Sequence, residues 1–169
     1  KELAEAGFNG KQIFEILERV KMESSIYITV DTLKFLKKGG RITPAAAALG
    51  TLLRIKPVLQ IQGEKLDSFS KVRTMKQART TMLSAAEKDL SERYADPKAE
   101  NTWIFVAHTQ NTEPAEEFAK EIEAQYPAAG AIDQAPLSLS IACHIGPGSL
   151  AIAMSKKIDI EAERKRYGL

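Results

Sequence analysis

One pair of β-rich segments, joined by no more than a turn, constrains the fold of this chain most. Residues 57–61 and 65–69 have the composition of strands, and Gln62-Gly63-Glu64 between them is typical of a turn, so they predict a β-hairpin. The other predicted strands alternate with helices along the chain. Because a hairpin is antiparallel, the two patterns together predict an α/β (α+β) fold, in which helices cover a mixed, partly antiparallel sheet in two layers.

The remaining elements follow from hydrophobic periodicity and from residues that begin or end helices. Strands are predicted over residues 25–30, 103–107, 132–139 and 150–154. Helices are predicted after Gly10, from Asp31 as N-cap to Gly39-Gly40, after Thr43-Pro44, after Thr74, over residues 113–126 and from Asp159. The strand over residues 103–107 is expected to be buried, and the helix after Thr74 to be the longest.

The length and the apolar segments bound the organisation of the chain. Its 169 residues are enough for one domain with a full hydrophobic core. Residues 1–24 are interpreted as a helix left from an N-terminal lobe or linker, and residues 25–169 as the domain itself. The longest nearly apolar stretch, residues 44–53, is too short to span a membrane. No secretion leader is recognisable and Cys143 has no second cysteine, so a reducing cytoplasm is expected.

Positive charge is concentrated in one part of the chain. Residues 34–79 contain eleven Lys and Arg against two acidic residues, a net charge of +9, although the whole chain carries only +2. Such a segment attracts phosphate, nucleic acid or an acidic protein. A basic but otherwise inert surface explains the same pattern equally well.

The most specific local feature is the sequence ACHIGPG at residues 142–148. His144 stands just before a turn whose glycines allow close approach of the backbone, and Pro147 removes one amide donor. An imidazole beside the amides of Gly146, Gly148 and Ser149 suits a carboxylate or another anion. The alternative is a tight turn between two strands, with a histidine that serves only the structure.

Basic residues also precede two predicted helices. Arg41 follows Gly39-Gly40 near the start of one helix, and Arg73 lies just before the helix that begins after Thr74. Helix N-termini favour anions, so both arginines are candidates for anion recognition. The alternative is that these arginines pair with carboxylates inside the fold.

Other combinations of reactive residues are weaker. His108 and Thr109 follow a predicted strand, a position that lines clefts in many α/β proteins, although a histidine that opens a loop explains the pattern as well. Two histidines and one cysteine lack the spacing of a metal site. Neither a phosphate-binding loop nor a nucleophile elbow is present. A hydrolase that uses Ser140 or Cys143 with His144 stays open as a less favoured alternative.

Several of these segments together resemble the DegV family. The resemblance runs in order through residues 31–33 (DTL), 36–42 (LKKGGRI), 49–50 (LG), Leu53, 55–59 (IKPVL), Gly63, 71–74 (KVRT) and 144–148 (HIGPG). Any one motif is weak, but their order and spacing are specific. Family members have a Gly two residues before the histidine, where this chain has Ala142.

The resemblance implies a lipid-binding function without cofactor or metal. Members of the family bind one long-chain fatty acid between two α/β lobes, and some serve as the acyl-carrying subunit of a bacterial fatty acid kinase. It implies that His144 lies near the fatty acid carboxylate and that further ligands lie in an N-terminal lobe outside this chain. Catalysis would belong to the separate kinase subunit. The +9 charge of residues 34–79 motivates a further hypothesis, that Arg41, Lys56 and Arg73 contact an acidic kinase partner or an acyl phosphate.

The alternative from another class is a nucleic-acid-binding or regulatory domain that uses the basic segment 34–79. Aromatic residues make up only 7% of the chain, and none interleaves with the basic residues in a stacking pattern. Binding to single-stranded nucleic acid is therefore not expected, and the lipid-binding hypothesis is preferred.

Overall fold

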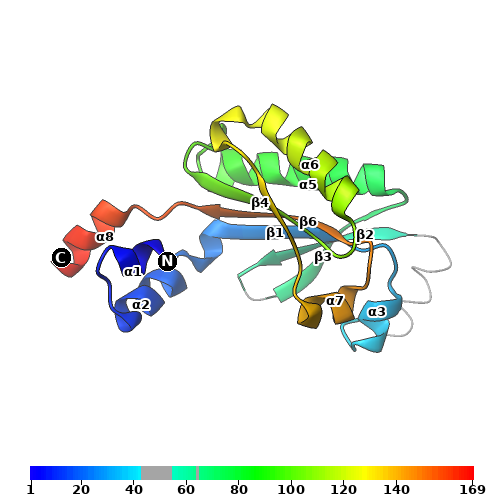
Figure 1. Ribbon diagram of the computed structural model, residues 1–169, viewed down its shortest axis with the longest axis horizontal. Coiled ribbons are helices and arrows are strands. Elements are labelled where there is room, and N and C mark those ends of the chain that lie inside the picture. The colour runs from blue at the N-terminus through cyan, green and yellow to red at the C-terminus, as the bar shows by residue number, and fades with distance from the viewer. Residues whose placement is uncertain (43–54, 64) are drawn as a thin grey trace.

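A six-stranded mixed sheet forms the centre of the computed structural model, which describes residues 1–42, 55–63 and 65–169 (Figure 1). The strands are β1 Ser24–Thr29, β2 Lys56–Gln62, β3 Lys65–Val72, β4 Thr102–His108, β5 Asp133–Pro136 and β6 Leu150–Lys156. Their order is β3-β2-β1-β6-β4-β5, and the β4–β5 pair is parallel while the other neighbouring pairs are antiparallel. The predicted mixed sheet and the hairpin of β2 and β3 are confirmed.

The described helices divide between the two faces and one end of the sheet. They are α1 Glu2–Glu5, α2 Gly10–Val20, α3 Lys34–Lys38, α5 Met75–Lys88, α6 Thr112–Gln125, α7 Leu139–Ile145 and α8 Ile160–Tyr167. The long helices α5 and α6 cover one face, whereas α3 and α7 lie on the opposite side near one end (Figure 1). Thr74 caps α5 by accepting a hydrogen bond from the Gln77 amide, as its sequence predicts.

The main core lies between the sheet and the helices α5 and α6. Because side chains alternate along a strand, every second residue of β4 and β6 enters it, including Ile104, Val106 and Ile152. Met82 of α5 and Phe118 of α6 are completely buried against these strands. This arrangement leaves the alternate residues of the same strands on the other face.

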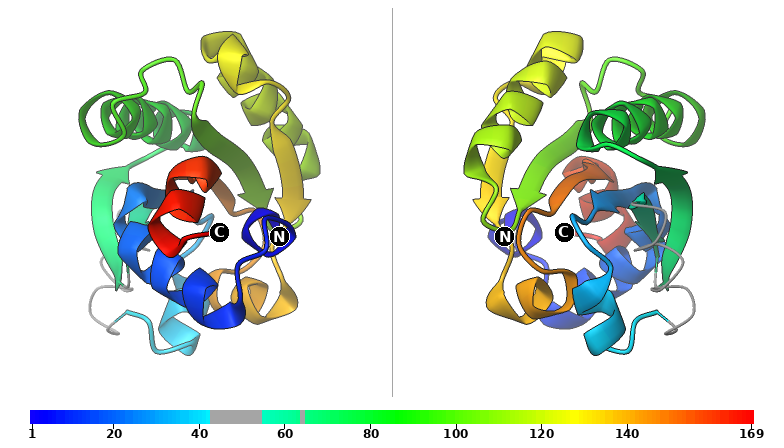
Figure 2. Two further views of the ribbon diagram at one scale, coloured as in Figure 1. Left: turned by 90° about the vertical axis from the view of Figure 1, so that its left-hand side faces the viewer. Right: turned by 90° about the vertical axis from the view of Figure 1, so that its right-hand side faces the viewer.

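A smaller cluster joins the two ends of the chain. Phe8 and Ile16 pack with Ile160 and Tyr167, so that α8 lies beside α1 and α2 (Figure 2). Arg19 of α2 forms an ion pair with Glu163 of α8 at 2.5 Å. The proposed division at residue 24 stays a prediction. The helices α1 and α2, which precede it, pack against the C-terminal helix α8.

Two predictions about local structure are wrong. The strand predicted over residues 132–139 is limited to β5, because residues 139–145 form the helix α7 instead. The strand predicted to be buried, β4, is covered on one face only, and Trp103 and Phe105 are 42% and 40% exposed on the other.

The role predicted for Asp31 is also wrong. The α3 helix begins after Leu33 without a side-chain cap, and Asp31 accepts hydrogen bonds from the Lys56 ammonium at its carboxylate (2.5 Å) and at its carbonyl oxygen (2.7 Å). The ion pair holds Asp31 away from the helix start. The helix predicted after Thr43-Pro44 lies outside the described residues.

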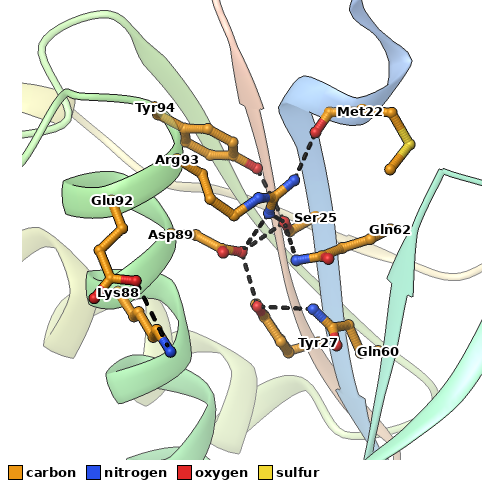
Figure 3. A network of polar contacts seen from close by, with 10 residues as sticks. All are labelled: Met22, Ser25, Tyr27, Gln60, Gln62, Lys88, Asp89, Glu92, Arg93 and Tyr94. Atoms are coloured by element: carbon orange, nitrogen blue, oxygen red, sulfur yellow. Dashed lines mark hydrogen bonds and ion pairs between the residues drawn. The ribbon is translucent and has the colours of Figure 1, made fainter.

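A network of polar side chains lies between β1 and the end of α5 (Figure 3). The Asp89 carboxylate is buried in a π-helical turn, Asp89–Arg93, where it accepts hydrogen bonds from Ser25 (2.6 Å) and Tyr27 (2.8 Å) and pairs with Arg93 (2.9 Å). The Ser25 hydroxyl in turn accepts a hydrogen bond from Tyr94 (3.0 Å). Each partner thus compensates the cost of removing the Asp89 charge from water.

We expect Asp89→Ala to destabilise the protein. Loss of the Asp89 carboxylate leaves three donors without their acceptor. Removal of one member of a largely buried ion pair lowers the free energy of unfolding by about 3 kcal/mol. Urea unfolding followed by circular dichroism measures the change. Glu87→Ala, at an exposed acidic residue near the end of α5, is the matched control and should change stability by less than about 0.5 kcal/mol. Equal unfolding midpoints for both variants would contradict a stabilising role for the network.

We also expect stability to fall in alkaline solution. Burial, reinforced by the hydrogen bond to Asp89, raises the pKa of Tyr27, and burial likewise raises the pKa of Tyr94 and of Tyr126. These pKa values lie above the unfolded value of about 10, so the stabilisation is present below that pH and is lost as the pH rises through the folded values. Above about pH 10, the free energy of unfolding should decline less steeply with pH in Tyr27→Phe than in the unsubstituted protein. If the two proteins lose stability equally with pH, the raised pKa of Tyr27 does not contribute to the loss.

Candidate functional site

His144 lies in the last turn of α7, a short helix that packs against α3. The helix ends at Gly146, whose φ of 78° requires a left-handed conformation that glycine adopts easily. The His144 side chain is half-buried, and within the described residues its imidazole has no hydrogen-bonding partner. Among the described residues, the imidazole is therefore a candidate for contact with a ligand.

The amides that the sequence assigns to ligand binding already have partners within the chain. The Gly146 amide donates to Ala142 (2.8 Å) and the Gly148 amide to the carbonyl oxygen of Thr109 (2.7 Å). The Ser149 amide donates to the Thr109 hydroxyl (3.1 Å), and Ser149 is completely buried. These three residues hold the turn in shape, and His144 is the candidate whose side chain has no hydrogen bond to the described part of the chain.

Thr109 is the residue of this site whose role the sequence does not reveal. It is buried at the end of β4, where its hydroxyl donates to the Gly146 carbonyl at 2.5 Å, and its own amide donates to Ser149 at 3.2 Å. The sequence predicts that both His108 and Thr109 follow a strand.

His108 agrees with the simpler of the two interpretations of its position. It is buried and accepts a hydrogen bond from the Asn111 amide at 3.2 Å, so it opens the loop before α6.

An apolar strip crosses the sheet on the face opposite α5 and α6. Its members pair directly from strand to strand and are Leu66, Ile61, Ile26, Ala153 and Phe105. Leu66 and Phe105, at the two ends of the strip, are 41% and 40% exposed. Trp103 stacks beside Phe105 with a centroid separation of 6.5 Å. A partly exposed apolar row of this length suits a hydrophobic ligand.

The strip lies next to the part of the sheet that α3 and α7 cover. The adjacent row of Leu59, Ile28 and Ala151 forms a buried cluster with Ile145, the residue after His144. The helix α7 therefore packs over the covered end of an apolar surface that becomes exposed farther along the strands. The imidazole of His144 itself lies against Gly39 at the end of α3.

The three predicted basic contacts lie in different environments. Lys56 pairs with Asp31, whereas Arg41 and Arg73 are exposed and have no carboxylate partner in the described parts of the chain. Arg41 donates to the Gly39 carbonyl at 2.6 Å, and Arg73 lies on an open groove with Lys71 and Lys76 at the start of α5. Of the three residues, Lys56 thus forms an ion pair within the described chain, and Arg41 and Arg73 are exposed to solvent.

The geometry offers little support for hydrolysis or metal binding. The Ser140 hydroxyl pairs with that of Ser138 at 3.0 Å, and no hydrogen bond joins it to His144 in the described chain. Cys143 and His144 are neighbours on a helix, and adjacent helical residues do not face each other. The described residues contain no group of three or more potential metal ligands, and none of the described helices is long and apolar enough to cross a membrane.

Comparison with known sequences gives consistent matches. The model of the DegV family, described as uncharacterised proteins, matches residues 1–157. A DegV domain-containing protein of Staphylococcus aureus strain COL is 33% identical over 151 residues, which are 89% of this chain and 50% of that protein. The chain thus spans about half the length of the curated relatives it matches.

Solved structures agree with the sequence comparison. DegV from Bacillus subtilis, described as a fatty acid binding protein, is 30% identical with a TM-score of 0.74, over 92% of this chain and 53% of that one. A DegV family protein from Thermus thermophilus, whose structure is described as showing fatty acid binding, is 29% identical with a TM-score of 0.76, again over 92% and 53%. By its sequence and by its fold, the chain belongs to the DegV family.

Proposed function

We propose that the protein binds one long-chain fatty acid, with the carboxylate beside His144 and the tail along the apolar strip. The observation that carries the proposal is that His144, half-buried and without a hydrogen-bonding partner among the described residues, lies on a helix that packs over one end of a partly exposed apolar face. The descriptions of the Bacillus subtilis and Thermus thermophilus relatives as fatty acid binding support it. Because this chain spans about half of those proteins, we place the rest of the pocket in an N-terminal lobe.

The energetics of a fatty acid explain why both features are needed. Each methylene buried against the strip contributes about 0.8 kcal/mol, so the tail supplies most of the affinity. A carboxylate taken out of water without a partner costs several kcal/mol, which would cancel much of that gain. An imidazole N–H donor offsets this cost and fixes which end of the ligand lies at α7. In this proposal Gly146, Gly148 and Ser149 shape the turn that carries His144.

We further propose that the protein presents the bound lipid to a fatty acid kinase subunit in the cytoplasm and is not itself an enzyme. Arg41 and Arg73 are the candidate contacts, because both are exposed and free of carboxylate partners in the described chain, and Lys56 contributes to a lesser degree because it pairs with Asp31. Arg79 also pairs with Glu117 and Glu121. These ion pairs reduce the free positive charge of residues 34–79, which makes nucleic-acid binding the less favoured function.

We expect His144→Ala to reduce fatty acid occupancy. Loss of a hydrogen bond to a charged group should weaken binding of oleate by about tenfold or more. Native mass spectrometry of the full-length protein, after exposure to equimolar oleate, measures occupancy. Ser140→Ala, one turn earlier on the same helix, is the control and should retain the lipid. Undiminished occupancy in His144→Ala would count against the proposed carboxylate site.

We expect Arg41→Glu and Arg73→Glu to weaken binding of the kinase subunit while oleate occupancy stays unchanged. A reversed charge in a complementary interface slows association and costs about tenfold or more in affinity. Surface plasmon resonance at two salt concentrations measures the effect, and Lys98→Glu, an exposed residue on another loop, serves as the control. Should the arginine variants fail to fold, or bind the kinase normally, the proposed contact is wrong.

A further inference from the structure

The two adjacent glycines after α3 are required for different reasons. Gly40 has a φ of 68°, a left-handed conformation in which a side chain is strained. Gly39 has φ −79° and ψ 0°, which most residues adopt without strain. The backbone at position 39 therefore does not require glycine, and the reason for glycine there must lie in its surroundings.

Gly39 faces the side chain of His144. An alanine methyl group at position 39 would lie 2.7 Å from Nδ1 and 3.6 Å from Cγ of the imidazole. Real carbon–nitrogen contacts are longer than 2.7 Å, so either the backbone or the ring would have to move.

The backbone at position 39 is held more firmly than the ring. The Gly39 amide donates to the Phe35 carbonyl at 2.8 Å, and its carbonyl oxygen accepts the hydrogen bond from Arg41. The Phe35 ring lies directly against Gly146, in space that a side chain at position 146 would fill, so α3 and α7 cannot easily separate. The imidazole has no hydrogen bond in the described structure, so an alanine at position 39 would displace the ring and not the backbone.

We propose that Gly39 is a positioning residue for His144. Its missing side chain admits the Nδ1 edge of the imidazole against the end of α3, which leaves Nε2 as the nitrogen available to the carboxylate. This inference rests on the proposed fatty acid site for its functional meaning, but the contact between Gly39 and the ring can be tested without any ligand.

Nitrogen NMR of the imidazoles tests this contact directly. The chain has only two histidines, so His144→Ala assigns the signals, and buried His108 is an internal reference. In the ligand-free full-length protein, Gly39→Ala should shift both ring nitrogens of His144 and leave His108 unchanged. Oleate should shift Nε2 of the unsubstituted protein, and Gly39→Ala should weaken oleate binding by about tenfold, the scale of one lost hydrogen bond to a charged group.

Two matched substitutions separate contact from backbone effects. Gly10→Ala, at a position with nothing within 4 Å, should change neither the His144 signals nor oleate binding. Gly40→Ala, at a position with no neighbour within the same distance, should lower stability through backbone strain and leave the ring signals in place.

The outcomes distinguish this inference from the proposed function. Unchanged His144 signals in Gly39→Ala, or an equal shift in Gly40→Ala, would overturn the positioning role. Normal oleate binding by His144→Ala would overturn the carboxylate site instead, whatever the ring signals show. If Gly39→Ala does not fold, the double variant Gly39→Ala/His144→Ala decides the matter, since recovered folding supports the contact and continued unfolding refutes it.

Discussion

The alternation of side chains along β6 is the constraint on which the rest of this structure depends. The strand pairs with both β1 and β4, so its two faces define the two environments of the sheet. Leu150, Ile152 and Met154 point toward α5 and α6 and are buried in the main core. Ala151 and Ala153 point toward the opposite face of the sheet. Because these side chains are small, the middle of that face carries no bulky group from β6. Larger residues there would fill the space above the apolar strip.

The turn after α7 owes its shape to a strand that is distant in sequence. Thr109, at the end of β4, binds Gly146, Gly148 and Ser149 through its backbone and its hydroxyl. Because β4 and β6 are hydrogen-bonded neighbours, this anchor is as rigid as the sheet itself. A short helix of seven residues has little stability alone, so α7 depends on this anchor and on α3 for its place.

The sequence predicts the long, periodic elements well and the short, context-dependent ones poorly. The hairpin, α5 and α6 are confirmed because their patterns repeat over many residues. The sequence does not predict the helix α7, because its apolar residues carry no clear period, and the motif at residues 142–148 is typical of a turn between two strands. Asp31 was misassigned because its partner, Lys56, lies 25 residues away. The role of His144 stays a prediction from its motif, whereas its contact with Gly39 depends on tertiary structure and is not visible in the sequence.

One consequence follows from the position of the single tryptophan. Trp103 stands beside Phe105 at one end of the apolar strip, 42% exposed, with the Lys157 ammonium 4.7 Å from its ring centroid. A hydrocarbon chain lying there would displace water from the indole and move its fluorescence emission to shorter wavelength. Trp103 would thus act as an intrinsic optical probe of that face and would report the proposed occupancy without any added label.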